Sequence, residues 1–255
     1  MDKSSRKCVL VTGASSGIGA ATARAFATDG YQVAIHYHSN RQGAEETYQS
    51  LQGEGHLLIN HGDLADPQSV RATLSETIDH FGRLDVLVNN AGIFEHVPFD
   101  TPDYEDWVSG WQRTIDTNLM SAVNATYLAL PIMRSQGGGK VINVASRSAF
   151  RAETTAPAYA VSKAGMVNLT RCLARAEAHN GILSYCIAPG WVETAMAREG
   201  MEDPAMWADI VSQIPLGRIA SVEDVAGVAL FLASDSANYL TGITIPVAGG
   251  SWMTT

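Results

Sequence analysis

Residues 8–19, Cys8-Val-Leu-Val-Thr-Gly-Ala-Ser-Ser-Gly-Ile-Gly19, carry the pattern that decides the fold. Cys8 to Val11 is an apolar run of strand length, a glycine-rich turn follows, and residues 20–28 have the composition of a helix. This order presents backbone N–H groups and a helix N-terminus, both of which bind phosphate. The glycine spacing is G-x-x-x-G-x-G and not the commonest dinucleotide-binding spacing, so a tight turn with glycines for packing is the alternative interpretation.

Strand and helix patterns alternate along the rest of the chain. We expect further strands at residues 31–37, 57–60, 84–88, 140–145, 182–188 and 242–247. This alternation predicts an α/β fold with a parallel sheet covered by helices on both faces. Ligands bind such sheets outside the carboxyl ends of the strands, and several candidate residues fall there. They are Gly13, Tyr37, Asp63, Asn90 and Ser146.

Local signals place several helix boundaries. Pro67 follows Asp66 and opens a helix that runs to about His80, and Ser221-Val-Glu-Asp224 resembles a capping box. Residues 103–135 form one long helical stretch, which Gly110 could interrupt and Pro131 should kink. We see no repeat, linker or low-complexity tract, so we expect a single domain over residues 1–255.

Composition and charge limit the function classes. The chain has 255 residues, of which 46% are hydrophobic, and a formal net charge of −9. An acidic chain without a basic run is a poor candidate for binding nucleic acid or an anionic membrane. No apolar run approaches the roughly 20 residues of a spanning helix. The first seven residues leave no room for a signal peptide, and the three cysteines show no CxxC spacing, so we expect a cytoplasmic protein with reduced thiols.

A candidate acid–base pair follows the strand at residues 140–145. Ser146 stands at the strand end, and Tyr159 and Lys163 lie four positions apart in the helix that Pro157 opens. A free tyrosine has a pKa of about 10, which a neighbouring ammonium and the positive end of a helix lower. The pattern predicts a tyrosine that exchanges a proton with an alcohol or carbonyl oxygen, with Ser146 holding that oxygen. A Tyr-x-x-x-Lys pair also arises by chance, so the rest of the chain has to support this interpretation.

The end of the second strand bears on cofactor choice. In dinucleotide-binding folds an acidic residue about 20 positions after the glycines binds the ribose 2′-hydroxyl of NAD. Residues 36–41 read His-Tyr-His-Ser-Asn-Arg, and no carboxylate appears before Glu45. His38, Ser39 and Arg41 suit a 2′-phosphate better, so the sequence favours NADP(H). His36 and His38 share one strand face, but no third ligand has suitable spacing and we expect no metal site.

Three further features allow two interpretations each. Asp63 could bind an adenine amino group or cap a turn. Asn118 lies among apolar neighbours in a helix, where an asparagine is more often solvent-facing than functional. Residues 191–215 could form a mobile lid over an apolar substrate, or their large side chains could pack into the core. Those side chains are Met196, Met201, Met206 and Trp207.

Taken together, these motifs resemble the short-chain dehydrogenase/reductase family, from about residue 6 to the C-terminus. The glycine turn, the Asn89-Asn90-Ala91-Gly92 segment and the Pro189-Gly190 segment with Thr194 match the family in order and spacing. The resemblance implies a Rossmann-like sheet of seven parallel strands and assembly as a homotetramer, or a dimer. The implied catalytic tetrad is Asn118, Ser146, Tyr159 and Lys163. The implied cofactor contacts are Gly13, Ser15, Ser16, Gly17, Ile18, Gly19, Tyr37, His38, Ser39, Arg41, Asp63, Leu64, Asn90, Ala91, Gly92, Tyr159, Lys163, Pro189, Gly190, Val192 and Thr194.

The resemblance also implies a mechanism. The cofactor supplies a hydride to a carbonyl carbon while Tyr159 protonates the oxygen and Ser146 orients the carbonyl. Lys163 binds the ribose hydroxyls and holds the Tyr159 pKa down, and Asn118 positions a water that connects Lys163 to solvent. The end of the second strand resembles NADPH-using members such as 3-oxoacyl-acyl-carrier-protein reductases and pteridine reductases.

Three departures from the family pattern stand beside these expectations. Ser16 occupies a position where many NADPH users carry a basic residue. Ala248 replaces the aspartate of the usual Asp-Gly-Gly ending, which could alter an interface or a loop contact. Arg147, Phe150 and Arg151 replace a glycine-rich turn, and they could shape the substrate site or lie on the surface.

The leading hypothesis is an NADPH-dependent reductase that converts a carbonyl to a secondary alcohol, similar to the 3-oxoacyl reductases. The alternative enzyme is an NAD-dependent dehydrogenase of a sugar or secondary alcohol. A non-catalytic cofactor-binding protein is disfavoured because such a relative would be expected to lose tetrad members, and all four are present. Substrate choice should depend on the loops at residues 93–102, 147–157 and 194–215.

Overall fold

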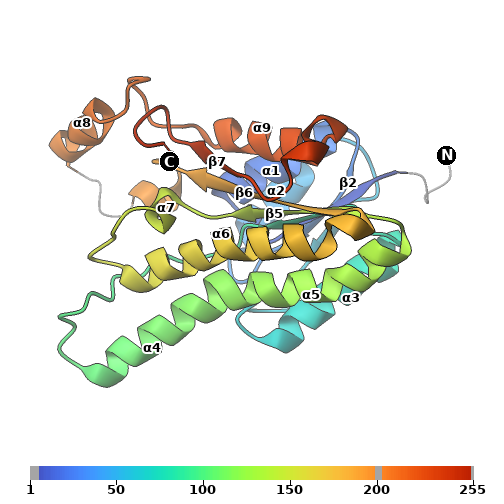
Figure 1. Ribbon diagram of the computed structural model, residues 1–255, viewed down its shortest axis with the longest axis horizontal. Coiled ribbons are helices and arrows are strands. Elements are labelled where there is room, and N and C mark those ends of the chain that lie inside the picture. The colour runs from blue at the N-terminus through green and yellow to red at the C-terminus, as the bar shows by residue number, and fades with distance from the viewer. Residues whose placement is uncertain (1–5, 199–202, 254–255) are drawn as a thin grey trace.

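Seven parallel strands form one sheet in this protein, whose computed structural model describes residues 6–198 and 203–253 (Figure 1). The strand order is β3-β2-β1-β4-β5-β6-β7, so the predicted fold class is confirmed. The order reverses between β1 and β4, and such a switch point is where ligands bind in doubly wound sheets. The strands are β1 Cys8–Val11, β2 Gln32–His36, β3 Leu57–Ile59, β4 Val86–Asn89, β5 Gly139–Val144, β6 Ile182–Pro189 and β7 Thr244–Val247.

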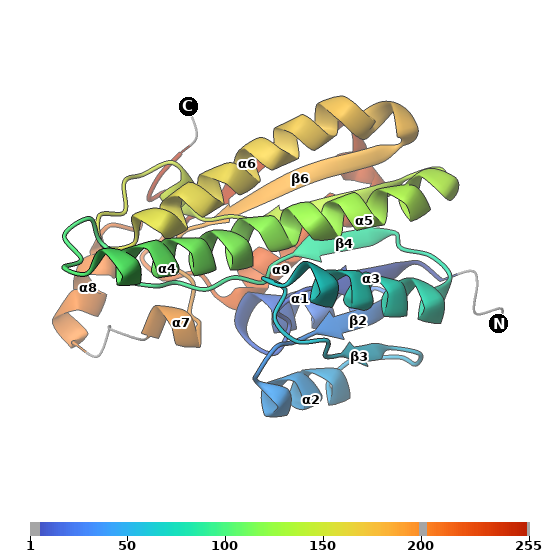
Figure 2. The same cartoon turned by 90° about the horizontal axis from the view of Figure 1, so that it is seen from below.

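Helices cover both faces of the sheet (Figures 1 and 2). One face carries α1 Gly17–Thr28 and α9 Val222–Ala233, with α2 Arg41–Gln49 beside α1 at the β3 edge. The other carries α3 Pro67–Phe81, α4 Tyr104–Ile115, α5 Ser121–Ser135 and α6 Pro157–Glu177. The short helices α7 Ala195–Arg198 and α8 Pro204–Ser212 lie beyond the carboxyl ends of the strands, at the left of Figure 1. No helix in the described part of the chain is long and apolar enough to cross a membrane.

The apolar runs in the sequence become strands buried on both faces. In β1, Val9 and Val11 pack with Phe26 of α1 in the core beneath α9, whereas Leu10 points into the opposite core with Leu74 of α3. Successive side chains of a strand alternate between the two faces, so a strand covered on both sides needs an unbroken apolar sequence. The expected capping box at Ser221 and Asp224 is present at the start of α9.

The long helical stretch differs from expectation at one point. It runs through Gly110 without a break, and its irregularity is instead a π-helical segment, Asp116–Met120, between α4 and α5. Gly110 serves close packing, because a Cβ there would lie 2.6 Å from a methyl group of Val97. A π-helical turn inside an α-helix often marks a functional position, and this one contains Asn118.

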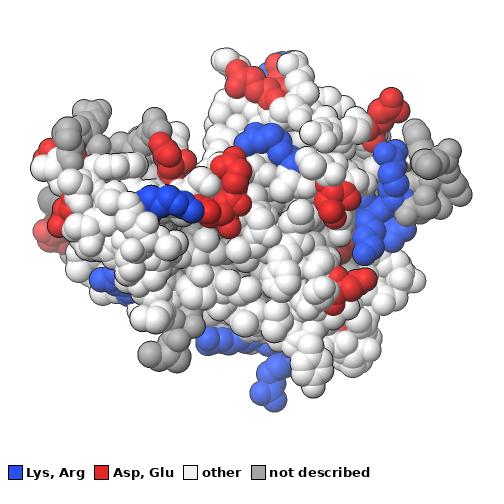
Figure 3. All heavy atoms as spheres, turned by 90° about the horizontal axis from the view of Figure 1, so that it is seen from above, with Lys and Arg blue, Asp and Glu red and all other residues white. Residues whose placement is uncertain are grey.

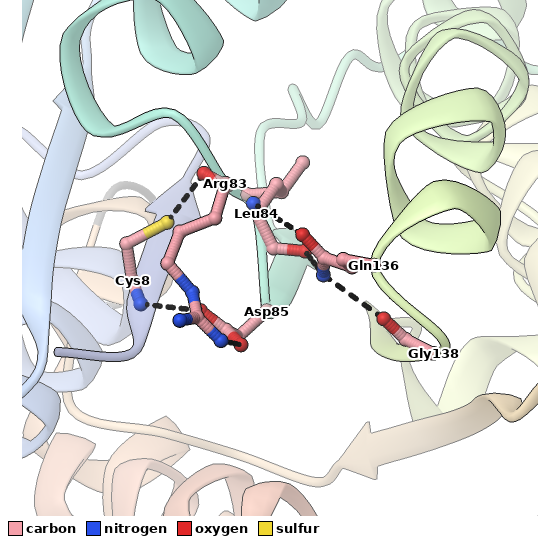
Figure 4. Close-up of polar contacts among 6 residues, drawn as sticks. All are labelled: Cys8, Arg83, Leu84, Asp85, Gln136 and Gly138. Atoms are coloured by element: carbon pink, nitrogen blue, oxygen red, sulfur yellow. Dashed lines mark hydrogen bonds and ion pairs between the residues drawn. The ribbon is translucent and has the colours of Figure 1, made fainter. Parts of the chain in front are cut away.

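Polar contacts fasten the amino edge of the sheet (Figure 4). β4 begins at Val86, two residues later than expected, and the main-chain groups of Leu84 bond to a side chain and not to a neighbouring strand. Asp85 binds the Arg83 guanidinium at 2.6 and 2.7 Å and accepts a hydrogen bond of 2.8 Å from the Cys8 main chain. The Gln136 amide holds both main-chain groups of Leu84. These contacts join β1, β4 and the end of α5 at the edge opposite to the candidate site.

Candidate active site

The glycine turn lies at the switch point of the sheet. Gly13 and Gly17 have φ angles of 64° and 54°, which glycine adopts without strain. A Cβ on Gly19 would meet the Gly13 carbonyl oxygen at 2.4 Å. Ser16 is the N-cap of α1 but makes no side-chain hydrogen bond to the first turn. The first N–H groups of α1 therefore lack a side-chain cap, which suits them to bind a phosphate oxygen.

Asn90 braces this turn from the end of β4. Its side-chain amide donates hydrogen bonds to the carbonyl oxygens of Thr12 and Gly13, at 2.9 and 3.0 Å. The main-chain N–H groups of Asn90 and Ala91 both donate to the Thr12 hydroxyl at 3.0 Å. The sequence interpretation placed Asn90 against the cofactor and missed Thr12. The sequence signal that could have identified Thr12 is its position, because a hydroxyl side chain stands directly after the apolar run and before the glycine turn.

The end of β2 places the residues expected to bind a 2′-phosphate at the surface beside α2. Tyr37 is buried, whereas His38, Ser39 and Arg41 are exposed. The Asn40 side chain caps α2 by accepting a hydrogen bond from the Gly43 N–H at 3.0 Å. The Arg41 guanidinium forms an ion pair with Glu45, one turn further along the helix, at 2.7 Å. Arg41 is thus at the expected place but already paired with a carboxylate.

Asp63 caps a turn, as one of its two interpretations predicted. Its carboxylate accepts a hydrogen bond from the Ala65 N–H at 3.0 Å, and Asp66 then caps α3. Leu64 is buried in the core beneath β3. His36, also buried, contacts the Gly62 carbonyl oxygen at 3.2 Å, and burial lowers its pKa to about 4. No group of three potential metal ligands occurs in residues 6–198 or 203–253.

Ser146 and Tyr159 meet at the carboxyl edge between β5 and α6. The Ser146 hydroxyl lies close enough to that of Tyr159 to act on its pKa, and it accepts a hydrogen bond from the Ser148 N–H at 3.1 Å. Tyr159 keeps some accessible surface, but protein atoms surround its hydroxyl. This desolvation raises the pKa of Tyr159, and the Ser146 hydroxyl opposes the rise. The expectation that Tyr159 has a lowered pKa is therefore wrong for the cofactor-free protein.

Lys163 does not lower the Tyr159 pKa here because its ammonium points elsewhere. Its Nζ donates to the Val144 carbonyl oxygen at 3.0 Å, and it lies 5.7 Å from the centroid of the Tyr159 ring. Lys163 is only 4% exposed and has no carboxylate within ion-pair distance among the described residues. Desolvation lowers its pKa to about 8.

Asn118 is fully buried, against the expectation for an ordinary mid-helix asparagine. Its side-chain oxygen accepts from the Ile93 N–H at 2.7 Å, and its amide donates to the Ile93 carbonyl oxygen at 2.9 Å and the Ser162 hydroxyl at 3.2 Å. A Cβ on Gly92 would lie 3.2 Å from the Asn118 side-chain oxygen and 3.3 Å from Lys163 Nζ. The four residues of the expected tetrad thus gather around the ends of β4 and β5.

The segment after β6 folds back toward the glycine turn. Gly190 donates its N–H to the Val247 carbonyl oxygen at 2.9 Å, and Val192 pairs with Ala220. A methyl group of Thr194 lies 3.3 Å from where a Cβ on Gly17 would stand. Ala248 packs against this segment, because a Cβ on Gly190 would lie 3.1 Å from the Ala248 Cα.

Helices α7 and α8 continue from this segment. Met196 and Met206 are 47% and 50% exposed, so neither packs into a core, and Met201 lies outside the described residues. Trp207 is partly buried. The prediction of core packing is therefore wrong for Met196 and Met206. Their exposure leaves the lid at residues 191–215 a prediction.

Aromatic side chains surround the tyrosine and the two loops beside it. Phe94 packs edge-on against Tyr159, with ring centroids 5.0 Å apart. Arg147 lies over the ring of Trp191, 4.5 Å from its centroid, and Phe150 stacks on Trp252 at 5.0 Å. Arg151 is exposed. The sequence interpretation had not singled out Phe94, Trp191 or Trp252 as single residues, because their roles depend on contacts between distant loops.

A Rossmann-like sheet, with a glycine turn at its switch point and a tyrosine–lysine pair at the same edge, defines a nicotinamide-dependent oxidoreductase. Comparison with known proteins identifies the family. A family model described as "Enoyl-(Acyl carrier protein) reductase" matches residues 13–251. The chain belongs to the short-chain dehydrogenase/reductase family, and it is an oxidoreductase.

Similar proteins carry several activities in their names. The 3-oxoacyl-[acyl-carrier-protein] reductase FabG of Staphylococcus aureus is 36% identical over 249 residues, covering 97% of this chain and 98% of that protein. The 3beta-hydroxysteroid dehydrogenase 1 of Eggerthella lenta is 37% identical over 246 residues, covering 96% and 93%. Among solved structures, a putative short-chain alcohol dehydrogenase from Sinorhizobium meliloti has a TM-score of 0.88 at 34% identity, covering 97% and 96%. Levodione reductase has a TM-score of 0.87 at 31% identity, covering 96% of each chain.

Proposed function

We propose that this protein is an NADPH-dependent reductase that converts a carbonyl group to a secondary alcohol, with Tyr159 as the general acid. The observation that carries the proposal is the placement of Ser146 and Tyr159 together at the carboxyl edge of the sheet, with the Lys163 ammonium 5.7 Å from the centroid of the tyrosine ring. The similarity to a 3-oxoacyl reductase supports the reductive direction. In the reverse direction the same tyrosine would accept a proton from an alcohol.

The residues around the glycine turn fit a dinucleotide. The uncapped start of α1 would bind the pyrophosphate, and the glycines allow its close approach. When bound, the nicotinamide cofactor supplies the hydride. Lys163 would exchange its contact with the Val144 carbonyl oxygen for the ribose hydroxyls, and the segment from Pro189 to Thr194 would hold the nicotinamide amide.

The state of Tyr159 suits proton donation. A raised pKa keeps its hydroxyl protonated at neutral pH, so the group can donate to an oxygen on which negative charge develops. Ser146 would hold that oxygen by a second hydrogen bond. Asn118 would position the main chain of Ile93 beside Lys163, through two hydrogen bonds that leave the Ile93 peptide groups no freedom to turn. A water relay from Lys163 to solvent would begin at this peptide.

The mechanism is tested by Tyr159→Phe, with Tyr127→Phe as the control because Tyr127 is 73% exposed. General acid–base groups contribute about 10²–10⁴-fold to rate. We expect Tyr159→Phe to lose at least about 10²-fold in kcat for reduction of a 3-oxoester, and to bind NADPH within about twofold of the unmodified protein. The control should keep both properties. Unchanged turnover in Tyr159→Phe would remove the catalytic assignment.

Lys163→Ala tests the second role of this pair. We expect both kcat and cofactor affinity to fall, because the same ammonium would act on the tyrosine and on the ribose. A fall in rate with unchanged affinity would argue against the contact with the ribose. Nicotinamide fluorescence measures the affinity, and NADPH consumption measures the rate.

Cofactor preference follows from the end of β2. His38, Ser39 and the N-terminus of α2 support a 2′-phosphate site, and no carboxylate stands at the strand end. The ion pair between Arg41 and Glu45 is the observation that favours the second candidate, an NAD-dependent dehydrogenase of a sugar or secondary alcohol. Titration with both cofactors decides between them. NADPH binding at least tenfold tighter than NADH, about 1.4 kcal/mol, supports the reductase, and preference for NADH reverses the order.

Apolar side chains on two faces support assembly as a homotetramer, or a dimer. On the α4 to α6 face, Tyr104 is 70% and Tyr127 73% exposed, and on the α9 side Tyr239 is fully exposed with Phe231 at 45%. The α9 side has broad uncharged areas between scattered charges (Figure 3). Light scattering after gel filtration should give a mass of two or four chains, and Tyr127→Glu should reduce it. A monomer at micromolar concentration would refute the assembly.

Four further expectations belong to the same proposal. The chain acts as a single domain, and residues 191–215 close over the substrate as a lid. All three cysteines are free thiols, which supports a cytoplasmic location. The partner of the site is a small molecule. Protection of α8 from proteolysis by cofactor and substrate together would be the expected sign of closure.

A further inference from the structure

Arg147 is a charged side chain held in place beside the catalytic serine. It follows Ser146 directly and begins the turn Arg147–Ala149, and its guanidinium lies 4.5 Å from the centroid of the Trp191 ring. Trp191 itself follows Gly190, at the end of β6. This contact joins the loops that follow β5 and β6, and the first of these loops begins at Ser146, which would hold the reacting carbonyl.

This guanidinium has no anionic partner. Within residues 6–198 and 203–253, no carboxylate lies within ion-pair distance of Arg147 and no acceptor forms a hydrogen bond with its side chain. Five other arginines of the described chain are ion-paired. They are Arg41, Arg83, Arg113, Arg134 and Arg218. Desolvation of this partly buried guanidinium and the nearby charge of Arg151 lower the pKa of Arg147, and the charge of Glu153 opposes the change.

The surroundings orient Arg147 for a planar anion. Trp191 fixes one face of the guanidinium by stacking, which leaves its N–H edge for an acceptor. In the same turn, Phe150 stacks on Trp252, and the indole N–H of Trp252 is buried without a hydrogen-bond acceptor among the described residues. Two side chains with unused donors, Arg147 within the turn and Trp252 packed against Phe150 at its end, thus lie near the loop that begins at Ser146.

We infer that the substrate carries a carboxylate close to its reacting carbonyl, and that Arg147 binds this carboxylate. The inference rests on the proposed carbonyl reduction and adds the substrate class to it. A guanidinium matches a carboxylate through two parallel hydrogen bonds, and such charge-assisted pairs are the strong ones in a partly dry site. Because Arg147 follows Ser146 directly, we expect only a few carbon atoms between the carboxylate and the carbonyl.

The test compares oxo acids with their methyl esters. The pairs are pyruvate with methyl pyruvate and 4-oxopentanoate with methyl 4-oxopentanoate, and NADPH consumption gives kcat/KM. For at least one pair we expect the acid to be favoured at least tenfold. Arg147→Met should lose that preference by lowering kcat/KM for the acid at least tenfold and for the ester less than threefold. Arg147→Lys should retain part of the preference, because it keeps the charge without the planar fork.

Arg151→Met is the matched control, since Arg151 is exposed and four residues away. It should change the acid-to-ester ratio less than threefold. Esters reduced as well as acids, or equal losses for both substrates in Arg147→Met, would overturn the inference. If Arg151→Met lost the preference for the acid as strongly as Arg147→Met, that preference would come from general attraction of anions and not from a specific site.

Binding of butyrate, which has no carbonyl to reduce, separates this inference from the proposed function. The Trp191 contact makes tryptophan fluorescence of the cofactor-loaded protein a suitable signal. Butyrate binding that Arg147→Met weakens at least tenfold, without reduction of any oxo compound, would support the anion site and reject the reductase. Ester reduction without butyrate binding would reject the anion site and support the reductase.

Discussion

Replacement of Lys163 by methionine should change how the stability of the cofactor-free protein depends on pH. Lys163 is buried, and this desolvation lowers its pKa from the ordinary 10.5 to about 8 in the folded chain. A lysine with a lowered folded pKa binds fewer protons when folded than when unfolded. Its ionisation therefore opposes folding below the folded pKa, and this opposition disappears as the pH rises from about 8 to 10.5.

The magnitude follows from the shift. A difference of 2.5 pKa units between 10.5 and about 8 corresponds to about 3 kcal/mol at about 1.36 kcal/mol per unit. Methionine removes this opposition, but it also removes the hydrogen bond to the Val144 carbonyl oxygen, which costs about 1–3 kcal/mol at every pH. The net effect at pH 7 is small, so the decisive quantity is its change. Relative to the unmodified protein, Lys163→Met should lose about 2.5 kcal/mol between pH 7 and pH 10.

Urea unfolding at several pH values, followed by circular dichroism, measures the difference between the two proteins. A group such as Cys8, whose raised pKa comes from burial and does not depend on Lys163, contributes equally to both proteins and cancels. Lys140→Met is the control. Lys140 is less buried and donates to the Ser234 carbonyl oxygen at 2.5 Å, so its removal should destabilise with a weaker pH dependence. The reasoning would be refuted if the free energy of unfolding of Lys163→Met, relative to the unmodified protein, stayed constant or rose between pH 7 and pH 10.

Three other substitutions test the cofactor and tetrad geometry. Gly19→Ala should weaken cofactor binding at least tenfold in a titration, because its Cβ would lie 2.4 Å from a backbone oxygen, whereas Gly227→Ala, with open space around it, should bind normally. Glu45→Gln should free Arg41 from its ion pair and tighten NADPH binding by about twofold to fivefold, which corresponds to the free energy of a surface ion pair. NADH binding should not change. Equal effects on the two cofactors would place Arg41 away from the 2′-phosphate. Asn118→Leu should destabilise the protein by about 2–5 kcal/mol in urea unfolding, since two main-chain groups lose buried partners, and a loss below about 1 kcal/mol would contradict the hydrogen-bond account.

The alternation of apolar strands and helices could be predicted from the sequence, because a strand that is buried on both faces needs an unbroken run of apolar residues. Val9, Leu10 and Val11 had to be apolar since their side chains enter two cores in turn. The glycine turn was readable for a similar reason, because backbone angles and close approach at Gly13 and Gly19 exclude other residues. The order of the motifs then identified the family without any contact being known.

The tertiary structure decided what the polar side chains do, because hydrogen-bond partners distant in the chain leave no local pattern. Asn118 looked like a solvent-facing residue until the π-helical segment brought it to the Ile93 peptide. The direction of the Tyr159 pKa shift also depended on the fold. Desolvation raises this pKa, and the Lys163 ammonium does not lower it because it donates to the Val144 carbonyl oxygen of β5. Arg147 could be surface or site in the sequence. Only the tertiary structure shows that Trp191, in the loop after β6, lies against its guanidinium.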